Sequence, residues 1–413
     1  MEIQKSAESG CCFIGTLKYF HYLLLLLVFS GCSSVGAIKV DADEKIEIEQ
    51  TQLQEKNLLD VGVIVFEGGE ISPEQQEQEG ISPEIRQAEA RYISYHLRET
   101  IQKTSSWGAV NVLPSESEVV DVIVNGEIIE STGEKLKLKI HVADSTGELW
   151  FENTYQTKVT RKNYTEIKDE NDLAEIYQGM YNRIANDINT YRKSIDSQRL
   201  MTIRNTSELK YAANLAPEIY KNYITQDDQG NTTILRLPAT DDPSLIRVKK
   251  IREREYLLVD TINEHYASYY EKVQATYGNW RKYYLIETLE KRKVEREAKF
   301  KKTLGAAAVI GSIVMVVLGE NASPGLVVAG VSLYVDGANA SEEAVIHKEA
   351  IVELSESLQT DVEPLVIEVD GEAKELTGTL DEQYLQWRAL LKAIYQEEVG
   401  IPSEVGNDAF SDA

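Results

Sequence analysis

The residues of this chain that could bind a metal or act as a nucleophile are few and lie far apart. All three cysteines fall within the first 32 residues, and beyond them come four widely separated histidines: Cys11, Cys12, Cys32, His96, His141, His265 and His347. No two of these histidines stand four residues apart or belong to a His-Glu-x-x-His run, the pattern that places zinc ligands on one helix face. We therefore expect no metal site and no cofactor.

Other catalytic motifs are also missing from the sequence. Gly68 and Gly69 follow a strand-like run, but neither a Gly-Lys-Ser nor a Gly-x-Gly-x-x-Gly phosphate loop follows them. The Asp144-Ser-Thr-Gly-Glu and Asp227-Asp-Gln-Gly-Asn segments lack the ligand alternation and the distal glutamate of a calcium loop, so they predict turns. A carboxylate pair for glycoside cleavage stays an open alternative among 68 acidic residues, but solvated surface acids explain them more simply. The sequence predicts a protein that is not an enzyme.

An apolar run near the amino terminus ends at one of the cysteines. Leu23–Phe29 follows Lys18 and leads directly into Ser30-Gly31-Cys32. Seven strongly apolar residues are too few to cross a hydrocarbon layer of ~30 Å. Their length and the small residues after them are typical of a secretory signal peptide, which we place at residues 1–31.

With its terminal cysteine, this run resembles the lipobox of bacterial lipoproteins. The resemblance implies that the peptide is cut before Cys32, whose thiol is diacylated, and that the new amino terminus receives a third acyl chain such as palmitate. Phe29 departs from the family, which usually has leucine there. Ser33 stands where the family's inner-membrane retention signal has aspartate, which implies an outer-membrane, periplasm-facing address. The alternatives are an ordinary cleaved signal and an uncleaved anchor.

Composition narrows the range of partners. The formal net charge is −25, so the chain should repel nucleic acid phosphates. Processing at Cys32 would leave no free thiol, which excludes disulfides and cysteine catalysis. Three acyl chains suffice for attachment without a basic patch, because two membrane signals already hold a protein stably. The expected partners are the membrane, through Cys32, and envelope proteins, with self-association open and any small-molecule ligand unknown.

The pattern predicts an α+β fold whose first part is a small α/β domain with a mostly antiparallel sheet. Residues 32–57 are polar and predict a weakly ordered acylated tether. The domain, residues 58–199, begins with the β-branched run 58–66 and a helix whose start is marked by Ser82-Pro83. A short strand, a three-strand meander over 119–155 and a helix over 173–199 complete it. In the meander, residues 136–142 alternate apolar and polar, as in a half-buried strand.

This order of elements resembles the periplasmic α/β domains of three groups of envelope proteins. These are the curli-secretion lipoprotein, the lipoprotein activators of penicillin-binding proteins, and the Tol-system propeller protein in its amino-terminal domain. The likeness is carried by Val61-Gly-Val-Ile-Val-Phe66, Tyr95-His-Leu-Arg-Glu-Thr-Ile, Trp107-Gly, Asp121-Val-Ile-Val-Asn-Gly126 and the hairpin ending at Trp150. In those families the domain docks proteins or assembles into larger objects, so the resemblance implies a docking domain.

A mainly helical part is predicted to follow, over residues 200–303. We expect an amphipathic helix at 209–223 and a very long one from Ser244 to about Thr303, in which Gly278 is a plausible kink. The long helix is rich in tyrosine and tryptophan. These residues favour core packing, with a partner-binding strip as the alternative.

An apolar Gly/Ala hairpin is predicted at residues 304–337. Leu304–Leu318 has no charge, a Gly319–Gly325 break follows, and Leu326–Val335 is again uncharged. Fifteen helical residues span ~22 Å, less than the hydrocarbon thickness, so a buried hairpin or self-association face is the first interpretation and membrane insertion the second. The chain should then end with a helix, a β-hairpin around Asp370-Gly371 and another helix (338–400), and a flexible tail (401–413).

These features lead to one functional hypothesis with two alternatives. The first is a lipid-anchored periplasmic scaffold or accessory subunit of an envelope assembly, which acts through protein contacts without catalysis. A pore or secretion component that inserts residues 304–335 into a membrane is the second. A lipoprotein regulator of peptidoglycan synthesis is the third.

Overall fold

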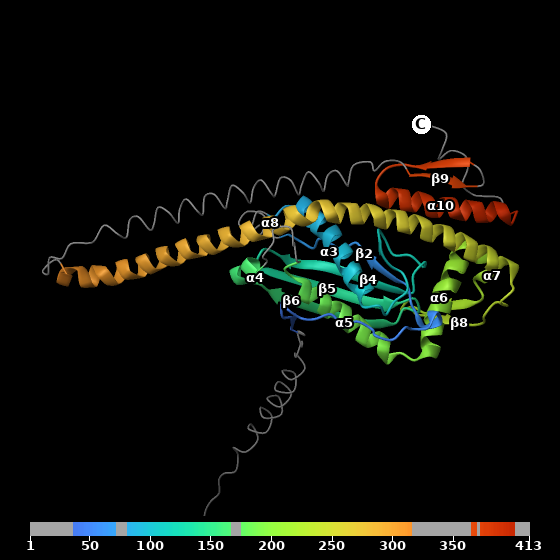
Figure 1. Ribbon diagram of the computed structural model, residues 1–413, viewed down its shortest axis with the longest axis horizontal. Helices are drawn as coiled ribbons and strands as arrows, with labels where there is room; N and C mark the ends of the chain where they lie inside the picture. The colour runs from blue at the N-terminus through green and yellow to red at the C-terminus, as the bar shows by residue number, and fades with distance from the viewer. Residues whose placement is uncertain (1–35, 72–80, 167–174, 316–364, 370–371, 401–413) are drawn as a thin grey trace, which may run out of the picture. The chain divides into compact units, whose positions relative to one another are not determined.

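The computed structural model describes residues 36–71, 81–166, 175–315, 365–369 and 372–400. The described residues from Ile38 onward belong to one compact unit. The fold is α+β, as predicted, with an α/β first part and a helical carboxyl-terminal part (Figure 1). Its elements up to β6 are β1 (Ile38–Lys39), η1 (Glu55–Asn57), β2 (Val61–Ile64), α3 (Pro83–Lys103), β3 (Val110–Leu113), β4 (Val122–Ser131), β5 (Lys135–Asp144) and β6 (Leu149–Lys158). After them come α4 (Arg161–Glu166), α5 (Gln178–Ser194), α6 (Ser197–Leu215), α7 (Pro217–Tyr220), β7 (Ile224–Gln226), β8 (Thr232–Ile234), α8 (Pro243–Met315), β9 (Leu365–Val369), β10 (Glu372–Leu376) and α10 (Leu380–Glu398).

Six strands form a mixed sheet in the order β1-β6-β5-β4-β2-β3. The antiparallel pairs β4·β5 and β5·β6 align nine residue pairs each, and they form the predicted meander. Strand β2 is parallel to both β3 and β4, and β1 is parallel to β6, with two to four aligned pairs in each case. The parallel pair β2·β3 follows from the β2–α3–β3 crossover, since a helix between two neighbouring strands returns the chain in the same direction.

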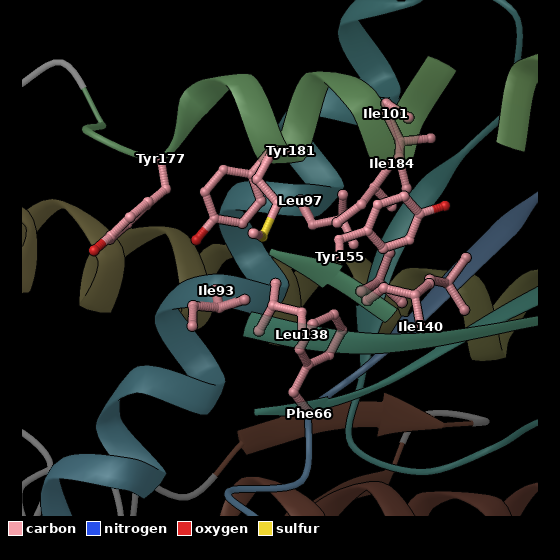
Figure 2. Close-up of a cluster of buried hydrophobic side chains, with 14 of the residues drawn as sticks. Phe66, Ile93, Leu97, Ile101, Leu138, Ile140, Tyr155, Tyr177, Tyr181 and Ile184 are labelled. Atoms are coloured by element: carbon pink, nitrogen blue, oxygen red, sulfur yellow. The ribbon is translucent and has the colours of Figure 1, made fainter. Parts of the chain in front are cut away.

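One face of the sheet is covered by helices; the other face is half-exposed along β4 and β5, whereas β2 and β3 are buried almost throughout. Strand β5 alternates between half-buried and fully buried residues along its whole length, as the sequence predicted. Its apolar side chains pack beneath α3 and α5, with Leu138 and Ile140 close to Leu97 and Ile184 (Figure 2). Helix α3 begins where predicted, because the Ser82 hydroxyl accepts from the Ile85 amide and Pro83 occupies the first turn.

The described part of the predicted tether is built into the domain. Strand β1 pairs with β6, Val40 is buried, and its amide donates to the Gln156 carbonyl oxygen over 2.9 Å. Further along, side chains of α5 hold the backbone, since Asn182 donates to Glu44 O and Asn186 to Lys45 O, at 2.7 and 2.8 Å. The prediction of a weakly ordered tether over 32–57 is therefore wrong from Ile38 onward. The polar composition of the segment concealed that it is held by backbone hydrogen bonds and by the buried Val40 side chain.

The helix predicted over 173–199 is divided in two. Helix α5 ends at Ser194, and Asp196 starts α6 by accepting from the Arg199 amide at 2.8 Å. A short hairpin, β7–β8, then closes the predicted turn at Asp227. The side chain of Asp227 accepts from the amides of Gln229 and Asn231, which is turn chemistry.

The long helix is confirmed, and α8 runs for 73 residues without a break at Gly278. The Asp242 carboxylate accepts from the amides of Ser244 and Leu245, so Asp242 and not Ser244 caps the helix. The helix packs on α3, β3 and α10 within the same compact unit, so the predicted boundary at residue 199 does not separate two domains. Its large aromatics fill the core, which confirms the core-packing interpretation for Tyr266, Tyr269, Tyr277 and Trp280.

Helix α8 also seals the edge strand β3. The Asn263 side chain accepts from the Val112 amide at 2.8 Å and donates to the Val112 carbonyl oxygen at 3.2 Å, as a neighbouring strand would. From α3, Arg98 donates to Val110 O at 2.6 Å and Gln102 accepts from Val110 N at 3.2 Å. This edge of the sheet is thus closed by side chains, which prevents pairing with another strand.

The carboxyl-terminal hairpin and helix are as predicted. Strands β9 and β10 pair antiparallel, and α10 begins with a capping box between Thr379 and Glu382. Helix α10 lies along α8 (Figure 1) and buries Trp387 and Leu391. Leu385 of the same helix is 58% exposed.

The predicted apolar hairpin lies mostly beyond the described residues. The backbone of α8 continues to Met315, inside the first uncharged run, and residues 316–364, which include the rest of the hairpin and the predicted helix after it, lie outside the described part, as do residues 401–413. Among the described residues, no helix is both long and apolar enough to cross a membrane.

Candidate functional site

The residues singled out from the sequence do not meet in the structure. Cys32 and His347 lie outside the described residues. His96 is buried beneath α8, whereas His141 lies on the half-exposed sheet face, 3.5 Å from the Glu152 carboxylate. The described residues contain no cluster of three or more His, Cys, Asp or Glu that could hold a metal.

A polar pocket of about 410 Å³ lies on the described part of the structure. It lies where α6 and α8 meet the amino-terminal ends of two parallel strands. Asp60 precedes β2 and Asp121 precedes β4, and the register Val61↔Val122 places the two aspartates side by side. Their backbones are linked, since the amides of Asp121 and Val122 both donate to Asp60 O.

Neutral donors hold both carboxylates. Asp60 accepts from the Ala109 amide at 2.9 Å and from the Tyr256 hydroxyl at 2.8 Å. Asp121 accepts from the Asp60 amide at 3.0 Å and from the Ser207 hydroxyl at 2.5 Å. Burial raises the pKa of the Asp121 carboxyl above its ordinary value, and the nearby Arg252 guanidinium opposes this rise.

The cations of the pocket come from α6, α8 and η1. Arg252 of α8 donates to Val119 O at 2.7 Å and to the Ser207 hydroxyl at 3.3 Å. Arg204 of α6 donates to Glu55 O at 2.9 Å, next to Lys56. Lys249 pairs with Glu208 at 3.2 Å. The pocket thus has an acidic floor from the sheet and a rim of cations from the surrounding elements, among which lie Glu208 of α6 and Glu253 of α8.

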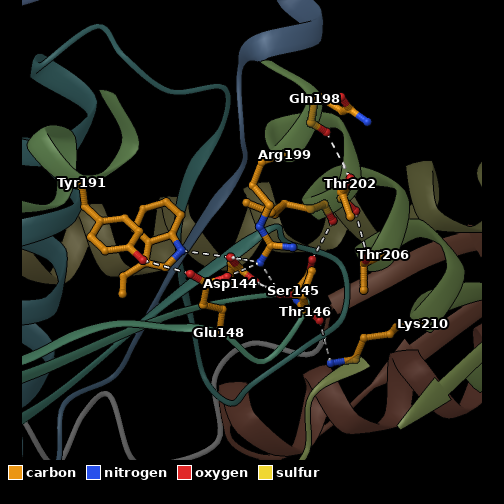
Figure 3. A network of polar contacts seen from close by, with 12 residues as sticks. Asp144, Ser145, Thr146, Glu148, Tyr191, Gln198, Arg199, Thr202, Thr206 and Lys210 are labelled. Atoms are coloured by element: carbon orange, nitrogen blue, oxygen red, sulfur yellow. Dashed lines mark hydrogen bonds and ion pairs between the residues drawn. The ribbon is translucent and has the colours of Figure 1, made fainter. Parts of the chain in front are cut away.

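A polar network fixes α6, and with it the rim. The Arg199 guanidinium contacts Asp144 at 3.2 Å, the Thr146 hydroxyl at 2.7 Å and Glu148 at 2.6 Å, as Figure 3 shows. The same Asp144 accepts from the Trp150 indole at 3.0 Å. The predicted turn at Asp144 is therefore the docking point for the start of α6.

A second polar cluster lies fully buried between α3, α5 and α8. Arg281 of α8 forms an ion pair with Glu175, and the two side chains are 1% and 2% exposed. Glu175 also accepts from the Tyr92 hydroxyl at 2.8 Å, and the Arg281 guanidinium lies 3.8 Å from the centre of the Tyr277 ring. Burial would raise the pKa of Glu175, but the Arg281 charge and the hydrogen bonds from Tyr92 and Arg281 together hold this pKa below its ordinary value.

His96 belongs to this cluster as a neutral side chain. Its Nε2 donates to the Gln178 amide oxygen at 2.8 Å, and its Nδ1 then accepts from the Tyr270 hydroxyl at 2.6 Å. Burial lowers the pKa of His96. Both ring nitrogens are satisfied without a charge, so His96 helps to hold α8 on α3 and is closed to ligands.

The geometry favours binding over proton transfer. Every oxygen of Asp60 and Asp121 already accepts a hydrogen bond from an amide or a hydroxyl, which orients the pair as a fixed acidic floor. Sequence analysis missed this site because it did not predict that β2 and β4 are parallel neighbours. An aspartate at the third position of each predicted run, Asp60 in 58–66 and Asp121 in the run that begins at 119, was the available signal.

Comparison with known proteins adds no assignment. No family model, no curated protein and no solved structure matches this chain. The resemblances of residues 19–34 and 58–199 stay predictions.

Proposed function

We propose that this protein is a lipid-anchored scaffold on the periplasmic face of a bacterial outer membrane, and that it acts through protein contacts and not through catalysis. The observation that supports this most is the continuity of α8. Leu258, Tyr277 and Leu285 of this helix are buried in the core, and the same helix continues to Met315.

This continuity suits a scaffold because it couples two parts of the chain rigidly. The 30 residues from Leu285 to Met315 correspond to ~45 Å of helix at 1.5 Å a residue. They lead from the core into the uncharged run that begins at Leu304. A partner or second copy bound at this run would be held at a fixed spacing from the domain.

The proposed anchor lies close to the domain in sequence. Five residues separate Cys32 from Ile38, the first residue paired in the sheet, so this connection of six residue steps can reach ~20 Å at most. An acylated Cys32 would therefore keep the domain near the membrane surface. The predicted tether of 26 residues would have allowed a much larger distance.

The test compares four proteins in a bacterial host: wild type, Cys32→Ser, Val309→Asp/Ile313→Asp, and the control Leu257→Asp, whose substituted side chain is 68% exposed on the same helix. We expect Cys32→Ser to leave the membrane fraction. The double variant should stay in the membrane fraction, but chemical crosslinking should no longer join it to neighbouring proteins. The control should behave as wild type in both measurements.

Two results would contradict the scaffold. Membrane attachment of Cys32→Ser that disappears only when Val309 and Ile313 are also charged would indicate insertion of residues 304–335. Crosslinks confined to penicillin-binding proteins, with a change in their activity, would instead indicate the regulator of peptidoglycan synthesis.

A further inference from the structure

The polar pocket between α6 and α8 contains charges of both signs that form no direct ion pair among the described residues, although the Arg252 guanidinium lies near Asp60 and Asp121. On its floor, the Asp60 and Asp121 carboxylates accept only from neutral amides and hydroxyls. On its rim, neither Lys56 nor Arg204 forms an ion pair within the described residues, and the one hydrogen bond from the Arg204 guanidinium goes to a backbone oxygen.

The two carboxylates differ in access. Asp121 is 2% exposed and serves mainly to fix the Asp60 amide. Asp60 is half-buried and faces the pocket, and each of its oxygens has one acceptor position left after its hydrogen bond. Asp60 is thus the floor group that a ligand could reach, and an ammonium group is the donor that suits a carboxylate best.

Ligands of a single charge fit this lining poorly. An anion seated on Arg204 and Lys56 would face the Asp60 carboxylate, and a cation seated on Asp60 would face the rim cations together with Arg252. A molecule that carries both charges can pair with each end and leaves no like charges in contact.

We propose that this pocket binds a small zwitterion with a primary ammonium and a carboxylate, of the size of an amino acid or short peptide. The ammonium donates to Asp60, and the carboxylate accepts from Arg204 and Lys56. The volume of about 410 Å³ lies within the range of small-molecule sites. This binding site is independent of the scaffold role, which rests on Cys32 and α8.

The test is isothermal titration of the full-length protein at low salt with four probes. These are alanine, alanyl-alanine, its N-acetyl derivative without the ammonium, and its amide without the carboxylate. We expect saturable binding of alanine or alanyl-alanine, and at least tenfold weaker binding of the two blocked dipeptides. Alanine against alanyl-alanine distinguishes an amino acid site from a peptide site.

Three variants complete the experiment. Asp60→Asn should weaken the binding of alanyl-alanine at least tenfold, so that it binds no more tightly than its N-acetyl derivative. Arg204→Gln should make alanyl-alanine bind no more tightly than its amide. Asp228→Asn, an exposed aspartate in the β7–β8 turn, is the control and should bind as wild type. Because Asp60 also supports the fold, circular dichroism must show each variant folded, and Arg204→Gln tests the proposal independently of Asp60. Equal binding of all probes, binding of the N-acetyl anion alone, or no saturable binding at 10 mM alanyl-alanine would overturn the proposal.

Discussion

Removal of the buried Arg281 guanidinium should destabilise the fold strongly. Arg281→Met keeps most of the side-chain volume but leaves the Glu175 carboxylate, 2% exposed, without its cation. Breaking one partner of a buried ion pair costs about 3–5 kcal/mol, because the remaining charge stays out of water. Water does not screen a pair of charges that is buried to this extent. We expect a loss of about 3–5 kcal/mol in the free energy of unfolding.

A double-mutant cycle separates this electrostatic cost from lost packing. Glu175→Gln retains an oxygen that can accept from the Tyr92 hydroxyl, and it removes the stranded charge. The double variant Glu175→Gln/Arg281→Met should therefore cost less than Arg281→Met alone, with a coupling energy of about 2–3 kcal/mol.

Urea unfolding followed by tryptophan fluorescence measures these energies. Trp280 stacks on Tyr277, with ring centres 5.7 Å apart, so it reports on this cluster. Arg247→Met, an exposed position on the same helix, is the matched control and should change stability by less than about 0.5 kcal/mol. Two results would contradict the view that this ion pair holds α8 in place: a loss below about 1 kcal/mol for Arg281→Met, or stability losses of the two single variants that simply add up in the double variant.

Three further predictions concern the same packing. Because burial lowers the pKa of His96, the unfolded state takes up its proton first, so stability should be full above pH 6.5 and fall as the pH drops below it. Melting temperatures against pH should show this slope in wild type and in His141→Gln, and a reduced slope in His96→Gln. Asn263→Ala should cost about 2–4 kcal/mol in urea unfolding, because the buried amide and carbonyl of Val112 lose their partner. The same measurement on Thr261→Ala should show little change, and equal effects would contradict the edge-sealing role. Gly133→Ala would place a Cβ 2.1 Å from the Arg281 carbonyl oxygen, so it should cost about 1–3 kcal/mol by displacing α8, and unchanged thermal unfolding would contradict this.

Local patterns in the sequence predicted the elements well. Alternation over residues 136–142, the Ser82-Pro83 start and the unbroken run after Ser244 each correspond to an observed element. These signals are carried by neighbours in sequence, so they do not depend on the tertiary fold.

The sequence could not predict which segments pair with one another when they lie far apart along the chain. The tether prediction failed because residues 38–49 are held largely by backbone hydrogen bonds to β6 and α5, and their only apolar pattern is the short alternation Ile38, Val40, Ala42. The domain boundary failed because the tyrosines of α8 look the same whether they fill a helical bundle or pack on a sheet. The Asp60–Asp121 pair depends on the parallel register of β2 and β4, which is a tertiary fact.

The most direct test of the scaffold proposal is photocrosslinking in living cells from a photoreactive amino acid at position 313, with position 257 as the reference. We expect position 313 to give protein adducts that disappear in the Cys32→Ser variant, and we expect position 257 not to give them. Adducts to lipid alone, or the same adducts from both positions, would contradict the scaffold proposal.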